Sequence, residues 1–145
     1  MKRPAVPFML LSALLFCAAA QASQSVEGRL FTARVPEEGW TVQSINDMTE
    51  ALIASDRSIV MTVTKMPARG LTLHEAALQL SRVHGASGIT KMEGAEEAYE
   101  YTGTVNGQRL YTQFFALPDA FGCISVIGDC ESPVATRVFN SIAIK

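Results

Sequence analysis

The pair Asn106-Gly107 constrains the fold of this chain more than any other feature, because it predicts a two-residue β-hairpin turn with a fixed register. The flanking residues alternate in character, and the turn places Tyr101 opposite Thr112 and Tyr99 opposite Phe114 on one face. This face is aromatic and apolar, so we expect it to be the core. The opposite face carries polar side chains and is expected to be wet or to line a shallow groove. It holds Glu100, Thr102, Thr104, Arg109, Tyr111 and Gln113.

Further strands are predicted wherever short apolar runs lie between turn-forming residues. These runs cover 30–35, 40–45, 50–55, 58–66 and 121–128. A hairpin of 50–55 with 58–66 would put Leu52 beside Met61. The polar residues 23–28 are expected to be an irregular lead-in.

Two helices have clear start signals. Thr72 and Glu75 form a capping box, which predicts a helix from Leu73 to about His84. Ser132-Pro133 is an N-cap followed by proline in the first turn, which predicts a final helix. Strands, a helix, more antiparallel strands and a second helix together predict an α+β fold, an antiparallel β-sheet with helices packed on it.

The N-terminus has the three parts of a secretory signal peptide. Lys2 and Arg3 precede an apolar run over 6–20, which ends at the small residues of Ala20-Gln21-Ala22. We expect cleavage after residue 22, a single domain over 23–145, and a periplasmic or secreted location; an uncleaved anchor is the alternative. The run is shorter than the roughly 20 residues that cross a bilayer, so we expect no transmembrane span after cleavage.

Charge narrows the classes of partner. The full chain has 12 basic and 14 acidic side chains, and the predicted cleavage removes only Lys2 and Arg3, which leaves 10 against 14, a formal charge of −4. Nucleic-acid binding rests on neutralising phosphates with a basic surface. The sequence therefore predicts no nucleic-acid partner.

Two cysteines, Cys123 and Cys130, remain after the predicted cleavage. In an oxidising compartment, two thiols seven residues apart favour a structural disulfide. A redox pair is the alternative, but the spacing is C-x6-C and no His or Lys neighbours either sulfur. We therefore expect a Cys123–Cys130 disulfide.

Catalytic and metal-binding arrangements cannot be assembled from this sequence. His74 and His84 lie ten residues apart on the predicted first helix, about 15 Å along its axis, so they cannot share a metal ion and are expected on the surface. Four glutamates between residues 93 and 100 lack the spacing of a calcium loop and are better explained as a solvated edge. We expect no catalytic residue, no metal, no cofactor and no enzymatic activity.

Three short stretches together resemble a known family. They are Phe31-x3-Val35-Pro36-x2-Gly39-Trp40, Leu71-Thr72-Leu73-x-Glu75-x-Ala77 and Val138-Phe139-Asn140-Ser141-Ile142. The set resembles the PsbP-like class of small domains, which includes bacterial envelope proteins of the DcrB type. The resemblance implies an α/β/α sandwich around an antiparallel sheet and a non-enzymatic docking role. It transfers no functional residue, because the matching positions are turn, cap and core positions.

Two functions are consistent with these observations. The first is an exported accessory protein that binds a partner protein or envelope component through one face of its sheet. Its candidate partner-facing surface is Tyr111, Phe115 and Arg109, on the wetter side of the second hairpin. The alternative is a small-molecule or lipid carrier with an apolar pocket between sheet and helix. The 48% hydrophobic content gives this alternative little support, because much of it belongs to the predicted signal peptide.

Overall fold

The computed structural model describes residues 23–94 and 96–145, so the predicted signal peptide, residues 1–22, lies outside the described residues. The elements in chain order are β1 (Gln24–Glu27), β2 (Phe31–Val35), β3 (Thr41–Asn46), β4 (Thr49–Ile53), β5 (Ile59–Met66), α1 (Leu73–Val83), β6 (Thr90–Lys91), β7 (Ala98–Val105), β8 (Gln108–Ala116), β9 (Phe121–Gly128), α2 (Pro133–Ser141) and β10 (Ala143–Ile144).

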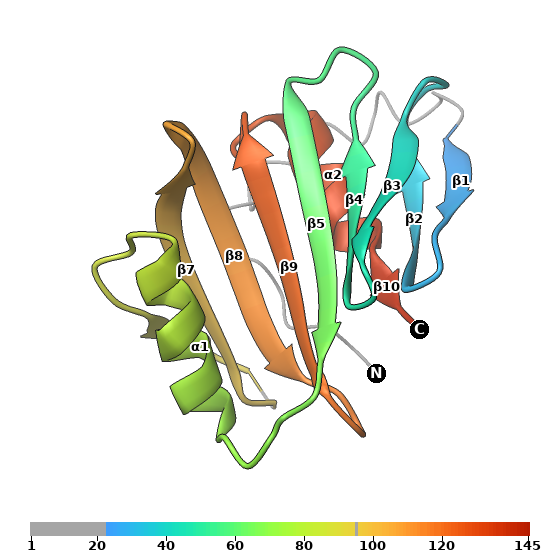
Figure 1. The fold of residues 1–145 in the computed structure, drawn as a ribbon. Helices are drawn as coiled ribbons and strands as arrows, with labels where there is room; N and C mark the ends of the chain where they lie inside the picture. The colour runs from blue at the N-terminus through green and yellow to red at the C-terminus, as the bar shows by residue number, and fades with distance from the viewer. Residues whose placement is uncertain (1–22, 95) are drawn as a thin grey trace.

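Seven strands form one antiparallel sheet in the order β3-β4-β5-β9-β8-β7-β6, and β1, β2 and β10 form a second sheet with β2 in the middle. Figure 1 shows α1 in front of the large sheet over β7 and β8, and α2 behind it beside the small sheet. The arrangement is α+β with helices packed on antiparallel sheets, which confirms the predicted fold class.

Both predicted hairpin registers are confirmed. Asn106 and Gly107 have φ angles of 50° and 77°, as a tight hairpin turn requires, and Tyr99 pairs with Phe114. In the other hairpin Leu52 pairs with Met61. Turn residues and strict alternation are local signals, so they determine register before any tertiary contact is known.

Both helix starts are also confirmed. The Thr72 hydroxyl accepts from the Glu75 backbone N–H at 3.1 Å, and the Glu75 carboxylate accepts from the Thr72 N–H at 2.8 Å. The Ser132 hydroxyl accepts from the backbone N–H of Ala135 at 3.0 Å. His84 is the C-cap of α1, and Gly85 follows with a φ of 64°.

The predicted irregular lead-in is wrong, because residues 24–27 form β1 and pair with β2 along its whole length. This strand is exposed except for the half-buried Val26, so it carries no alternation of buried and exposed side chains that a sequence pattern would show. The two-residue strands β6 and β10 were likewise not predicted, since a pair of residues has no period.

The large sheet buries apolar side chains on both faces, in two clusters. One cluster lies toward α2 and the small sheet and includes Phe31, Leu52 and Phe139. The other lies under α1 around Phe114 and Phe121. Because α1 packs mainly on β7 and β8, no described helix lies in front of β3, β4 and β5 (Figure 1).

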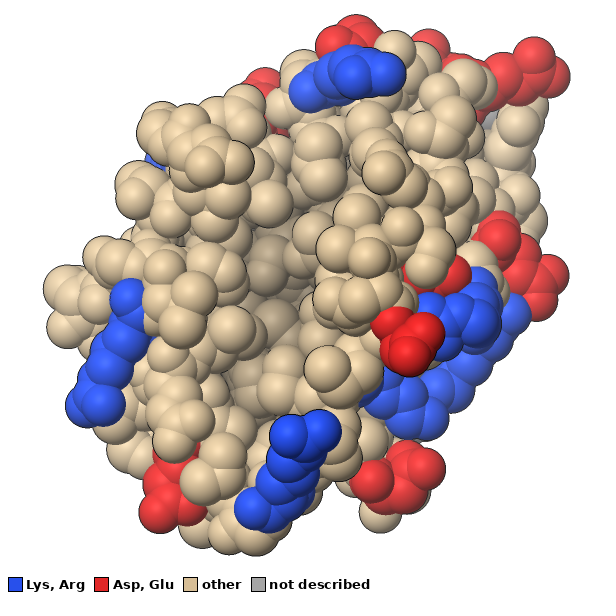
Figure 2. All heavy atoms as spheres, viewed as in Figure 1, with Lys and Arg blue, Asp and Glu red and all other residues tan. Residues whose placement is uncertain are grey.

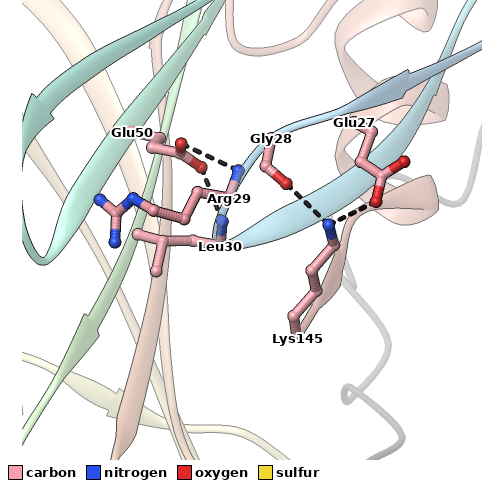
Figure 3. A network of polar contacts seen from close by, with 6 residues as sticks. All are labelled: Glu27, Gly28, Arg29, Leu30, Glu50 and Lys145. Atoms are coloured by element: carbon pink, nitrogen blue, oxygen red, sulfur yellow. Dashed lines mark hydrogen bonds and ion pairs between the residues drawn. The ribbon is translucent and has the colours of Figure 1, made fainter.

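A polar network joins the small sheet to the large one (Figure 3). The Glu50 carboxylate on β4 is 4% exposed and accepts from the backbone N–H groups of Arg29 and Leu30, at 3.0 and 2.8 Å. Nearby, Lys145 Nζ donates to Glu27 Oε1 at 2.6 Å and to the Gly28 carbonyl at 2.8 Å. These contacts hold the turn between β1 and β2 against β4 and the C-terminal residue, so their role is structural.

Candidate functional site

The three residues of the predicted partner-facing surface do not share an exposed face. Tyr111 and Phe115 are each 5% exposed and belong to the core on the α2 side, where the Tyr111 ring lies 5.8 Å from the Phe139 ring. The predicted exposure of these two side chains is wrong, because α2 and the small sheet cover this face and the hairpin register cannot reveal a covering element. Arg109 is exposed, and its guanidinium lies 3.0 Å from the Glu131 carboxylate.

Arg109 and Tyr111 nevertheless meet at a partly open groove of about 400 Å³. The groove lies where β7 and β8 approach the loop after α1 and the residues just before α2. It is lined by Ser87, Gly88, Ile89, Thr90, Glu100, Tyr101, Thr102, Arg109, Tyr111, Cys130 and Glu131. The predicted groove on this face of the hairpin is therefore confirmed for Glu100, Thr102, Arg109 and Tyr111.

A chain of hydrogen bonds fixes the polar groups of this groove. Gln113 Nε2 donates to Tyr111 Oη at 3.1 Å, and Tyr111 Oη donates to Glu100 Oε2 at 2.6 Å. Gln113 is fully buried, and within the described residues its Oε1 has no hydrogen-bond partner. The direction of these bonds leaves the Glu100 carboxylate as an acceptor at the groove.

Sequence reasoning found part of this arrangement and missed the rest. The hairpin register places Glu100 opposite Gln113 and Thr102 opposite Tyr111, so the contact between Glu100 and Tyr111 is a diagonal one that the register permits. Glu131 and residues 87–90 reach the groove through the tertiary fold alone, and no local pattern indicates them.

The two cysteines are free thiols, and the predicted disulfide is wrong. Cys123 packs in the cluster under α1, whereas Cys130 belongs to the cluster on the α2 side. The Cys130 thiol lies 3.3 Å from the Val126 carbonyl, and three residues of extended strand separate residue 126 from Cys123, about 10 Å. A disulfide needs Cα atoms about 4.4–6.8 Å apart. The two cysteines are close in sequence, but the residues between them include most of the extended strand β9, which keeps the two thiols apart.

Neither thiol is suited to nucleophilic chemistry. Burial raises the pKa of Cys123 to about 12, and burial likewise raises the pKa of Cys130. The reactive form of cysteine is the thiolate, which such environments disfavour.

Hydrogen-bonded polar side chains lie on the α1 side of the sheet. His84 Nδ1 is 2.7 Å from Tyr101 Oη, and on the neighbouring strands Thr112 Oγ1 is 2.8 Å from Ser125 Oγ. Burial lowers the pKa of His84 and raises that of Tyr101. Of the two histidines expected on the surface, His74 is exposed, but His84 is half-buried because it ends α1 against β7.

The glutamates between residues 93 and 100 do not converge on one point. The Glu97 carboxylate accepts from Tyr99 Oη at 2.9 Å, while the Glu100 carboxylate accepts from Tyr111. Tyr99 packs under α1 and Tyr111 packs on the opposite face of the sheet. Within residues 23–94 and 96–145, no group of three or more His, Cys, Asp or Glu side chains is placed to hold a metal ion.

A second candidate surface is the α1-side face of β3, β4, β5 and β9, which we call the open face. The open face takes in ten of the side chains that the strand registers point to this side, none of them charged: Thr41, Gln43, Thr49, Ala51, Ile53, Val60, Thr62, Thr64, Ser125 and Ile127. All except Ala51 and Ser125 are half-buried or exposed. Figure 2 shows this side of the molecule, with charged side chains around its periphery and an uncharged hollow near its centre.

Comparisons with known proteins add little to this geometry. No family model matches the chain, and no curated protein matches it. The chain is similar to a protein of Bacteroides thetaiotaomicron VPI-5482 whose crystal structure was solved at 1.50 Å, with 14% identity and a TM-score of 0.47. The match covers 85% of this chain and 48% of that protein, so the chain spans about half its length. The resemblance to PsbP-like domains therefore stays a prediction.

None of the helices in the described part of the chain is long and apolar enough to cross a membrane.

Proposed function

We propose that this protein is an exported, non-enzymatic accessory protein, and that a partner protein of the cell envelope docks on the open face. The observation that carries the proposal is that none of the ten side chains of the open face is charged, although eight of them are half-buried or exposed. Export is supported by the basic start, the apolar run and the small residues before Ser23.

A solvated sheet face normally carries charged side chains, and edge strands are commonly protected by charge. The open face has hydroxyl and aliphatic side chains instead, and its edge strand β3 contains no charged residue. The Thr49 and Thr64 hydroxyls hydrogen-bond to each other at 3.0 Å, so the polar groups of this face are uncharged hydroxyls. Depletion of charged residues is characteristic of the core of a protein–protein interface.

The carrier alternative has less support. That alternative requires an apolar pocket between sheet and helix, but no residue of α1 or α2 lines the groove beside α2, and most of its lining side chains are polar or charged. Apolar ligands bind in pockets lined mainly by hydrophobic side chains. The open face is therefore the better candidate for the main function.

Photo-crosslinking in intact cells tests the docking surface. A benzophenone amino acid at position 60, on the open face, is expected to give a covalent adduct of one defined mass. The matched control is position 137, an exposed site on α2 at the other side of the sheet. Thr62→Lys, which places an ammonium group in the face, is expected to weaken the position-60 adduct at least tenfold without changing the melting temperature.

Two results would contradict the proposal. Equal adducts from positions 60 and 137 would show contact without a specific surface, and no adduct from position 60 would remove the open face as the docking site. Export has its own test, since mass spectrometry of protein from the envelope fraction is expected to find Ser23 at the N-terminus.

A further inference from the structure

The groove beside α2 is separate from the open face, and its chemistry indicates a different kind of ligand. It lies on the opposite face of β7 and β8, and its residues take no part in the proposed docking surface. We infer that this groove binds an organic cation, an alkylammonium or alkylguanidinium group, through the carboxylate of Glu100.

The first argument is the direction of the hydrogen bonds. Tyr111 Oη accepts a hydrogen bond from Gln113 Nε2 and donates one to Glu100 Oε2, so its hydroxyl orients the carboxylate. Within the described residues no Lys or Arg forms an ion pair with Glu100. Glu100 is half-buried, so solvent screens its charge less than it screens that of an exposed carboxylate. The group that such an oriented carboxylate binds best is a charged N–H donor.

The second argument is the charge of the lining. Arg109 is the single cation among the lining residues, and it is paired with Glu131 at 3.0 Å. With Glu100 unpaired, the lining carries one net negative charge. An anionic ligand would have to separate the Arg109–Glu131 pair and also face Glu100, whereas a cation meets no such cost.

The third argument is the number of donors that such a ligand offers. Gln113 is fully buried and does not line the groove, but its Nε2 donates to Tyr111 Oη and so holds the tyrosine that orients Glu100. Ammonium has three N–H donors and guanidinium has five, so either can donate to both oxygens of the Glu100 carboxylate.

The volume and the ligand set favour an organic cation over a metal ion. A groove of about 400 Å³ is within the range of small-molecule sites. Hard metal ions need six or more oxygen ligands, whereas the described residues supply one unpaired carboxylate here.

Titrations followed by amide NMR shifts test this inference with n-butylammonium, n-butylguanidinium and, as the matched anion, n-butyrate. We expect saturable shifts confined to residues 87–90, 100–102, 109–111 and 130–131 with the two cations and none with butyrate. Glu100→Gln is expected to weaken binding at least tenfold. The matched control is Glu97→Gln, because Glu97 also accepts from a tyrosine hydroxyl but on the other face of the sheet.

A second variant keeps the test decisive should Glu100→Gln fail to fold. Thr102 is exposed and lines the groove, so Thr102→Lys would place a tethered ammonium beside Glu100 and is expected to abolish probe binding. The inference is overturned by equal binding of butyrate, by equal losses in the Glu97 and Glu100 variants, or by no saturable shift with either cation. None of these results bears on crosslinking from the open face.

Discussion

Replacing Glu50 with alanine is expected to destabilise the protein more than any other single substitution of a carboxylate. Glu50 is 4% exposed, and its two oxygens accept from the backbone N–H groups of Arg29 and Leu30 at 3.0 and 2.8 Å (Figure 3). These are the donors of the turn that connects β1 to β2, and within the described residues neither has a backbone acceptor.

The magnitude follows from these two bonds. A hydrogen bond to a charged group contributes about 1.5–3 kcal/mol, and a buried donor left without an acceptor costs about 1–3 kcal/mol. The Leu30 N–H is buried and loses its partner outright, whereas the Arg29 N–H is partly exposed and can turn to water. We therefore expect Glu50→Ala to lower the free energy of unfolding by about 2–4 kcal/mol, a large part of the roughly 5–15 kcal/mol typical of a domain.

Urea unfolding measures this loss, and hydrogen exchange locates it. The Arg29 and Leu30 amides should lose protection in Glu50→Ala, while the amides of β8 and β9 keep theirs apart from the global shift. Glu38→Ala is the matched control, because Glu38 is exposed and makes one long contact to Gln24 at 3.4 Å. A loss below about 1 kcal/mol, or equal losses in the two variants, would refute the assigned role of Glu50.

Three further predictions concern the thiols, His84 and Gly103. Protein that begins at Ser23, denatured without reduction, should take up two alkyl groups, at Cys123 and Cys130, whereas the native protein should react slowly with a thiol reagent; an intramolecular disulfide in mass spectra would contradict the geometry. Burial lowers the pKa of His84 below its ordinary 6.5, so the unfolded chain binds the extra proton first and melting temperature should fall as pH drops below about 6.5, less so in His84→Gln. Gly103→Ala should cost about 1–3 kcal/mol in urea unfolding, since its Cβ would overlap the His84 carbonyl oxygen; an unchanged midpoint would show that the end of α1 can move.

The sequence predicted what local chemistry determines. The turn residues Asn106 and Gly107 fixed one hairpin register, and the capping residues Thr72 and Ser132 marked the first turns of both helices. Each of these signals acts within a few residues, so the chain need not be folded for them to be read.

Tertiary covering could not be predicted in the same way. Tyr111 and Phe115 were assigned to the wetter face of the hairpin, but α2 and the small sheet cover that face. The disulfide prediction was wrong for a related reason. The chain between Cys123 and Cys130 is mostly extended, so the two side chains lie in different hydrophobic clusters. The sequence predicted the part of the groove that the hairpin β7–β8 forms. It did not predict the part that Glu131 forms, since Glu131 lies outside the hairpin.

Strand β8 presents side chains to both sides of the large sheet, and this decides which substitutions can separate the two proposed surfaces. Successive residues of a strand point to opposite faces, so Thr112 lies on the side of the open face while Tyr111 and Gln113 lie on the side of the groove. A substitution at any of the three would disturb backbone that both sides use, and its effect would not identify a surface. Thr62 and Thr102 lie on other strands, and neither is fully buried, so each changes one surface alone. If the two sites are independent, Thr62→Lys weakens crosslinking and leaves cation binding unchanged. Thr102→Lys then abolishes cation binding and leaves crosslinking unchanged.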